Sequence, residues 1–182
     1  MRVSVFGGAN PKPGSQAYEN ARLLGQQLAT HGHDVLTGGY VGSMEAVSRG
    51  AAEKGGHVIG VTCTEIERWR PGKANPWVKE EWKMPTLDTR LLKLIDCCDA
   101  AMALPGGPGT LAEIALMWNR MLIHAIPTRP LILIGKEWQT VFACMFSELD
   151  AYIAQRDRQM LSFAPGIQEA INHLRQVQPP FA

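Results

Sequence analysis

The feature that most constrains the fold of this chain is an alternation of short apolar runs, glycine-rich turns and segments with helical periodicity. The apolar runs predict strands at residues 3–6, 34–37, 58–62, 100–104, 131–134 and 160–163. The periodic segments predict helices at residues 15–30, 43–54, 87–97, 110–122, 141–154 and 167–177. Strands that alternate with helices run parallel and are joined by right-handed crossovers. We therefore predict the α/β class, with a Rossmann-like, doubly wound parallel sheet flanked by helices.

The length and charge of the chain narrow its possible partners. A chain of 182 residues, 46% hydrophobic and 19% charged, fits a single domain over residues 1–182 with a substantial core. The formal net charge is only +1, so neither a nucleic-acid groove nor an anionic membrane surface is an expected partner. Any anion that this protein binds must be held by local geometry.

The sequence also predicts a cytoplasmic protein without a metal site. No window approaches the roughly 18 apolar residues of a transmembrane helix, and the N-terminal residues do not read as a signal peptide. Cys63, Cys97, Cys98 and Cys144 form no C-x-x-C pair, which favours free thiols in a reducing compartment. The five histidines have neither ligand spacing nor acidic or cysteine partners, so we expect no bound metal.

Residues 63–85 interrupt the alternation. This stretch holds Trp69, Trp77 and Trp82 with three prolines and several charges, and it has no clear period. We expect an irregular excursion from the domain. Its aromatic side chains either pack locally on the surface, or they form a lid over a ligand or a dimer contact.

Three glycine-rich turns follow predicted strands, at residues 7–15, 37–43 and 105–110. In open α/β sheets, ligands bind beyond the carboxyl ends of the strands. We therefore expect the three turns to meet in one polar crevice.

The turn at residues 105–110 is the most informative of the three. Its glycines allow a ligand to approach the backbone, and Thr110 is expected to cap the following helix. The free N–H groups and the dipole of that helix would then suit a phosphate. Glu113 has capping-box spacing from Thr110, so it either caps the helix or supplies a carboxylate beside the phosphate site. Such a carboxylate can assist N-glycoside cleavage, in which positive charge builds on the ribose.

Arg90 lies near the start of the helix that precedes the same strand. At the ligand edge, its guanidinium could bind phosphate or polarise a leaving group. The alternative is an ordinary ion pair at the start of the helix, with Asp88 or another carboxylate.

The segment Pro-Gly-Gly-Pro-Gly-Thr-Leu-Ala-Glu at 105–113 matches a P-G-G-x-G-T-x-x-E motif. The chain thereby resembles the LOG family of cytokinin riboside 5′-monophosphate phosphoribohydrolases, once labelled lysine decarboxylase-like. The resemblance covers nearly the whole chain. It includes the turn with Gly7–Gly8 and the segment at 37–47. Arg90 stands at the family's spacing before Glu113.

This resemblance implies a catalytic pair, Arg90 and Glu113, in a homodimer that needs no metal or cofactor. It implies hydrolysis of a purine or cytokinin-type nucleoside 5′-monophosphate to a free base and ribose 5-phosphate. We expect eight residues of the three turns, and Met44 directly after the second turn, to bind the substrate or its phosphate: Gly8, Gly38, Gly39, Gly42, Met44, Gly106, Gly107, Gly109 and Thr110.

Three positions depart from the family pattern. Leu91 replaces the lysine of the usual Arg-Lys pair, Tyr40 replaces a glycine, and Glu45 replaces the glycine after Met44. The Met-Glu-Ala-Val variant is similar to a branch that includes molybdenum-cofactor carrier proteins. The alternative function is therefore non-catalytic binding of a nucleotide-like ligand. Tyr40, at the ligand edge, is a candidate for stacking on a base.

Overall fold

The computed structural model describes residues 1–70 and 72–176 and contains one seven-stranded, all-parallel sheet. The strands are β1 (Arg2–Phe6), β2 (Asp34–Thr37), β3 (Val58–Cys63), β4 (Glu80–Met84), β5 (Ala100–Ala103), β6 (Leu131–Ile134) and β7 (Ser162–Ala164). Their order is β4-β3-β2-β1-β5-β6-β7. The chain winds outward from β1 to β4, returns to β5 on the other side of β1, and winds outward again to β7. This confirms the predicted Rossmann-like, doubly wound α/β fold.

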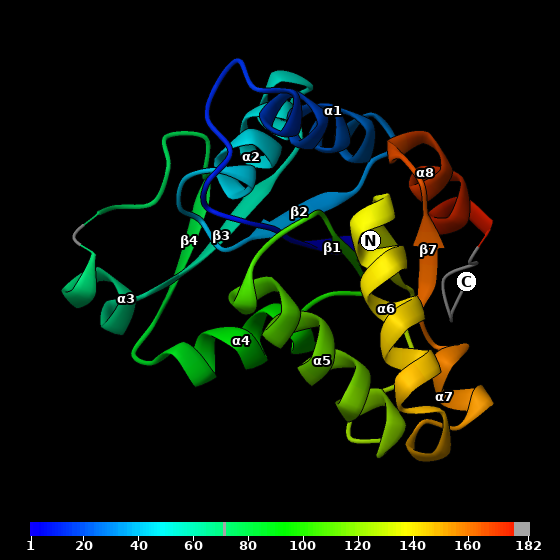
Figure 1. The fold of residues 1–182 in the computed structure, drawn as a ribbon. Helices are drawn as coiled ribbons and strands as arrows, with labels where there is room; N and C mark the ends of the chain where they lie inside the picture. Colours follow the sequence, from blue (N-terminus) through cyan, green and yellow to red (C-terminus); the bar gives the residue numbers. More distant parts are fainter. Residues whose placement is uncertain (71, 177–182) are drawn as a thin grey trace.

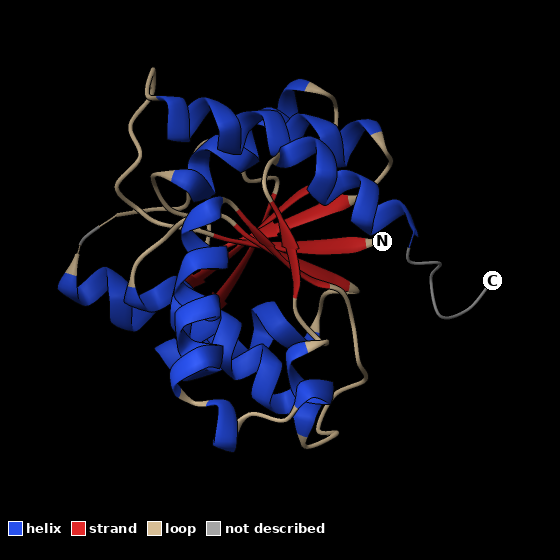
Figure 2. Cartoon of the chain, turned by 45° about the vertical axis from the view of Figure 1, so that its right-hand side comes forward, coloured by secondary structure: helices blue, strands red, loops and turns tan. Residues whose placement is uncertain are grey.

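Helices cover both faces of the sheet, as Figures 1 and 2 show. They are α1 (Gln16–Thr30), α2 (Ser43–Glu53), α3 (Thr64–Trp69), α4 (Leu87–Asp96), α5 (Pro108–Leu122), α6 (Lys136–Glu148), α7 (Gln155–Arg158) and α8 (Ile167–Gln176), with a 3-10 turn at Asp150–Tyr152. Helices α1, α2 and α8 share one apolar core with the sheet, and α4, α5 and α6 share the other. Burial on both faces explains why β1, β2, β3, β5 and β6 are nearly continuous apolar runs.

Two of the predicted elements need correction at their ends. The helix predicted at 141–154 is α6, which runs from Lys136 to Glu148. It begins earlier because Trp138 and Phe142 bury one of its faces against the sheet, and it ends before the 3-10 turn at Asp150–Tyr152. The strand predicted at 160–163 is β7, which begins at Ser162. The last helix was predicted to reach Val177, which lies outside the described residues.

The segment 63–85 is not the irregular excursion that the sequence predicts. It contains α3 and the strand β4, which pairs in parallel with β3 at the edge of the sheet. An edge strand buries little, and the sequence Glu-Glu-Trp-Lys-Met has no apolar run to mark it. The segment also holds local aromatic contacts: Trp77 lies under the guanidinium of Arg49, and Trp82 lies near Lys93.

Candidate functional site

The order of the strands reverses between β1 and β5, and the loops that follow these two strands touch. A side chain at Gly8 would meet the Cα atom of Gly106 at 3.5 Å. The third loop joins them, because the N–H of Ser43 donates to the carbonyl oxygen of Gly8 (2.9 Å). Gly42 has a φ of +75°, and a Cβ atom there would come within 2.6 Å of the backbone of Ala9. The predicted convergence of the three glycine-rich turns is therefore confirmed, at the point where open α/β sheets bind ligands.

The start of α5 differs from the prediction. The helix begins at Pro108 with Gly107 as its N-cap, so Thr110 does not cap it. The prediction that Thr110 and Glu113 form a capping box is therefore wrong as well. Proline is favoured at the first helical position because its missing N–H has no helical partner there.

Because α5 begins at Pro108, its N-terminal turn contains backbone N–H groups that have no hydrogen-bond partner within the helix. The first helical hydrogen bond runs from the N–H of Leu111 to the carbonyl oxygen of Gly107 (3.1 Å). The N–H groups of Gly109 and Thr110 precede that bond. Gly107 and Gly109 are exposed at this end of the helix. The geometry suits an anion, as the glycine pattern predicts.

Arg90 lies on α4 and reaches across the ends of β2 and β3. Its Nε donates to the carbonyl oxygen of Val61 (2.7 Å), and its Nη2 donates to that of Gly38 (3.1 Å). The residue is only 6% exposed, and Met44 Sδ lies 3.9 Å from Nη2. The ion pair with Asp88 is absent from the contacts of the described residues. Two neutral acceptors fix the guanidinium instead, and Nη1 points to Glu113.

Gly38 is required by this arrangement. A Cβ atom at Gly38 would overlap Nη2 of Arg90 and would come within 2.5 Å of Met44 Sδ. The absence of a side chain therefore allows the guanidinium to lie against the backbone of the second loop.

Glu113 lies on the second turn of α5, 8% exposed, and faces Arg90. Its Oε1 is 4.0 Å from Nη1 of Arg90, which is too long for a hydrogen bond. Burial raises the pKa of the Glu113 carboxyl to about 7, and the charge of Arg90 offsets only part of this rise. Both protonation states are thus populated near neutral pH. A buried acid that can gain or lose a proton near pH 7 is a candidate general acid or base.

Tyr40 packs beneath Arg90 and does not stack on a base. It is 6% exposed, and its ring centroid lies 5.7 Å from Cζ of Arg90. Its hydroxyl donates to the carbonyl oxygen of Cys63 (3.1 Å) and accepts from the Cys63 N–H (2.7 Å). The hypothesis of base stacking by Tyr40 is therefore wrong, because both its ring and its hydroxyl are engaged inside the protein.

Asn75 is a buried residue of this region that the sequence does not single out. Its Nδ2 donates to the carbonyl oxygens of Gly39 (3.1 Å) and Tyr40 (3.0 Å), and its backbone N–H donates to Gly39 as well (2.8 Å). These bonds fix the turn in which Gly39 has a φ of +75°. No local pattern marks Asn75, because its partners are 35 and 36 residues away.

The motif residues and this geometry agree with a match to a known family. The family model described as the SLOG cluster4 family matches residues 1–126. The chain belongs to this family.

Members of the LOG group are similar to the chain along almost its whole length. A probable cytokinin riboside 5′-monophosphate phosphoribohydrolase of Oryza sativa subsp. japonica is 30% identical, over 98% of this chain and 73% of the relative. A cytokinin riboside 5′-monophosphate phosphoribohydrolase of Arabidopsis thaliana is also 30% identical, over 98% of this chain and 83% of the relative. The predicted resemblance to the LOG family is confirmed.

Solved structures share the fold of this SLOG chain. The molybdenum cofactor carrier protein of Chlamydomonas reinhardtii is 27% identical with a TM-score of 0.72, over 96% of each chain. The molybdenum cofactor binding protein of Rippkaea orientalis is 24% identical with a TM-score of 0.74, over 96% of this chain and 95% of the other.

Two kinds of feature are absent from the described residues. No helix among them is long and apolar enough to cross a membrane. Residues 1–70 and 72–176 also contain no group of three or more histidine, cysteine, aspartate or glutamate side chains that could hold a metal ion.

Proposed function

We propose that this protein hydrolyses the N-glycosidic bond of a purine or cytokinin-type nucleoside 5′-monophosphate, with Arg90 and Glu113 as its catalytic residues. The observation that carries the proposal is the buried Glu113 carboxyl, with a pKa of about 7, opposite Arg90 beside the glycine-rich start of α5. The LOG relatives are named for hydrolysis of cytokinin riboside 5′-monophosphates, which are nucleotides of this class.

The phosphate binds at the start of α5. Its oxygens accept from the N–H groups of Gly109 and Thr110, while Gly106 and Gly107 let it approach the backbone. Gly8, Gly38, Gly39, Gly42 and Met44 complete the crevice around the ribose. A chain with a net charge of +1 binds its anion in this way without a basic surface.

In the reaction, the bond between the ribose C1′ and the base nitrogen breaks and positive charge develops on the ribose. The ionised Glu113 carboxylate stabilises this charge and takes a proton from the attacking water. The resulting hydroxyl bonds to C1′, the base leaves with the proton that Glu113 took from the water, and ribose 5-phosphate remains. Arg90 orients the substrate and assists departure of the base.

A second candidate is a carrier that binds a nucleotide-like ligand without turning it over. The molybdenum cofactor carrier protein of Chlamydomonas reinhardtii supports this candidate through its shared fold. Leu91, which stands where the family has a lysine, supports it as well, because one positive charge is missing beside Arg90.

A turnover assay distinguishes the two candidate functions. Purified protein is incubated with AMP or with its N6-isopentenyl analogue, and free base and ribose 5-phosphate are measured by chromatography. Release of both products in equal amounts by the parent, but not by Glu113→Gln, supports hydrolysis. Thermal stabilisation by nucleotide without release of base contradicts hydrolysis and supports the carrier.

We further propose that the protein is a cytoplasmic homodimer. Leu87 and Leu111, at the starts of α4 and α5, are each 41% exposed and offer apolar contact area close to the site. Light scattering during size exclusion is expected to give the mass of two chains, and a monomer mass would contradict this.

A further inference from the structure

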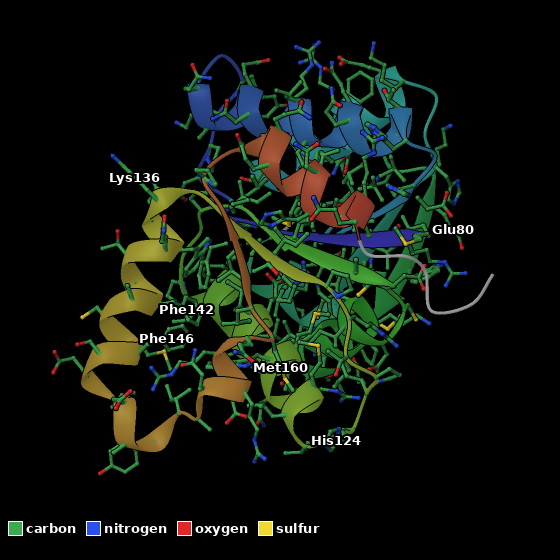
Figure 3. The ribbon with its side chains drawn as sticks, turned by 90° about the vertical axis from the view of Figure 1, so that its right-hand side faces the viewer. Glu80, His124, Lys136, Phe142, Phe146 and Met160 are labelled. Carbon is green, nitrogen blue, oxygen red and sulfur yellow. The ribbon has the colours of Figure 1, made fainter. Side chains whose placement is uncertain are left out.

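A second concave region lies beside the proposed nucleotide site. A cavity of about 870 Å³ opens between the start of α1, the turn from β6 to α6 and the start of α8. We name it the α1–α6–α8 cavity. Figure 3 shows Lys136 at the start of α6, on the same side of the molecule as the first turns of α1. Neither Arg90 nor Glu113 lines this cavity. Its volume falls in the range of small-molecule sites.

The cavity shares a wall with the phosphate-binding turns. Leu104 and Pro105, which directly precede Gly106, line it, and so does Ser43, whose N–H donates to Gly8. The start of α5 therefore lies between the Arg90–Glu113 pair and this cavity. The Arg90 and Glu113 side chains lie toward β2 and β3, and the cavity lies toward β6 and β7.

The chemistry of the walls favours an uncharged, partly apolar group. Leu23, Ile134 and Ile167 contribute aliphatic surface. Lys136 is balanced by Glu137 and Glu169, so the cavity itself does not attract an anion.

Amide groups add hydrogen-bonding capacity to this surface. Gln16 Nε2 donates to Asn20 Oδ1 (2.8 Å), and both side chains line the cavity. Each amide has further donor or acceptor capacity beyond this bond. Apolar walls with a few amides suit a heterocyclic base.

We propose that the α1–α6–α8 cavity binds the second nucleoside of a ligand in which two nucleosides are joined by a 5′,5′-pyrophosphate. The pyrophosphate lies at the start of α5, the first nucleoside lies toward Arg90 and Glu113, and the second enters the cavity. In doubly wound folds, dinucleotides bind across the point where the strand order reverses. The proposal rests on the proposed function, because the two share the phosphate site.

The test compares AMP with diadenosine pyrophosphate by calorimetry, in the Glu113→Gln background so that neither ligand is consumed. Ala17→Trp fills the cavity from an exposed position on α1 that lines it. Thr30→Trp, at the exposed far end of the same helix, is the matched control. Circular dichroism checks that all variants are folded.

The dinucleotide is expected to bind about tenfold more tightly than AMP or better. Ala17→Trp should remove this advantage and leave AMP affinity unchanged, while Thr30→Trp should change neither. Equal affinities of the two ligands, or an advantage that survives in Ala17→Trp, would overturn the proposal and leave the proposed function standing. Binding of the dinucleotide alone, sensitive to Ala17→Trp, would support the cavity site and contradict the AMP-based function.

Discussion

Two arginine–glutamate clusters in this protein show how differently the same side chains behave. Glu53 on α2 accepts hydrogen bonds from Arg22 Nε (2.8 Å) and Arg49 Nε (3.0 Å), and also from Gln26 on α1. The hydrogen bond from Arg22 is the main cause that lowers the pKa of Glu53 to about 2. Glu113 is buried and is 4.0 Å from the nearest nitrogen of Arg90, and burial raises its pKa to about 7.

The opposite pKa shifts of Glu53 and Glu113 distinguish a structural ion pair from a candidate catalytic pair. In the first cluster the arginines donate to the carboxylate and keep it charged, so it ties α1 to α2 at any ordinary pH. In the second, Arg90 donates to the carbonyl oxygens of Val61 and Gly38, and Glu113 is left without a hydrogen bond from it. The ionised form of Glu113 is thereby disfavoured, and its carboxyl can gain or lose a proton near pH 7.

The largest expected effect is on turnover. Glu113→Gln should lower kcat for AMP by about a thousandfold, because the amide cannot accept a proton from water. Glu53→Gln, which changes the same group in the structural cluster, should leave kcat unaltered. Steady-state kinetics with product chromatography measures both. Equal losses in the two variants would mean that the clusters do not differ in function.

Stability should depend on pH with opposite sign in the two clusters. The Glu113 carboxyl titrates near 4.5 when unfolded and near 7 when folded, so the free energy of unfolding should fall as pH rises between these values. The loss is on the order of 3 kcal/mol and should be absent in Glu113→Gln. For Glu53, stability is gained above pH 4.5 and lost as pH falls toward 2.

Urea denaturation from pH 3 to pH 8 tests both signs. If the parent protein keeps its full free energy of unfolding up to pH 8 and has the same pH profile as Glu113→Gln, the pKa of Glu113 is not raised.

The position of Arg90 can be disturbed without changing its charge. Gly38→Ala introduces a methyl group where Nη2 of Arg90 and Sδ of Met44 lie, so the guanidinium must move. A displacement of about 1 Å at a catalytic group costs about a hundredfold in rate, which is the expected loss in kcat/KM. Gly72→Ala is the control, since its nearest neighbour would be 3.9 Å away. Unchanged kinetics in Gly38→Ala would show that the close approach of Arg90 is not needed.

The smallest expected effect is at Tyr40. Tyr40→Phe keeps the ring near Arg90 but removes the hydroxyl that bonds to both backbone groups of Cys63. We expect a loss of about 1–2 kcal/mol in the free energy of unfolding, because the Cys63 N–H is left unpaired inside the protein. Tyr152→Phe, at a residue 84% exposed, should change nothing. Chemical denaturation of the two variants makes the comparison.

The sequence predicts most of this fold because local signals and tertiary structure agree. The strands at 34–37 and 131–134 match β2 and β6, since buried apolar runs between turns have few alternatives. The signals fail at β4, where the edge of the sheet tolerates exposed charges, and at the start of α6, where Gly135 rather than a polar cap precedes the helix.

For the candidate site, the sequence predicts the convergence of the glycine turns, because the ends of parallel strands meet at one edge. The pairing of Arg90 with Glu113 is implied by the resemblance to the LOG family. The spacing of Thr110 from Glu113 predicts a cap at Thr110, but α5 begins two residues earlier, at Pro108. The roles of Tyr40 and Asn75 depend on partners more than 20 residues away, which no local pattern reveals.

The most direct test of the central claim is the pH dependence of kcat/KM for AMP, which reports ionisations of the free enzyme. If Glu113 acts as a carboxylate whose pKa burial has raised, the rate should rise with pH and level off with an apparent pKa of about 7. The same profile should be kept by Glu53→Gln. A rate that is independent of pH between 5 and 8, or a profile centred near 4.5, would contradict the account.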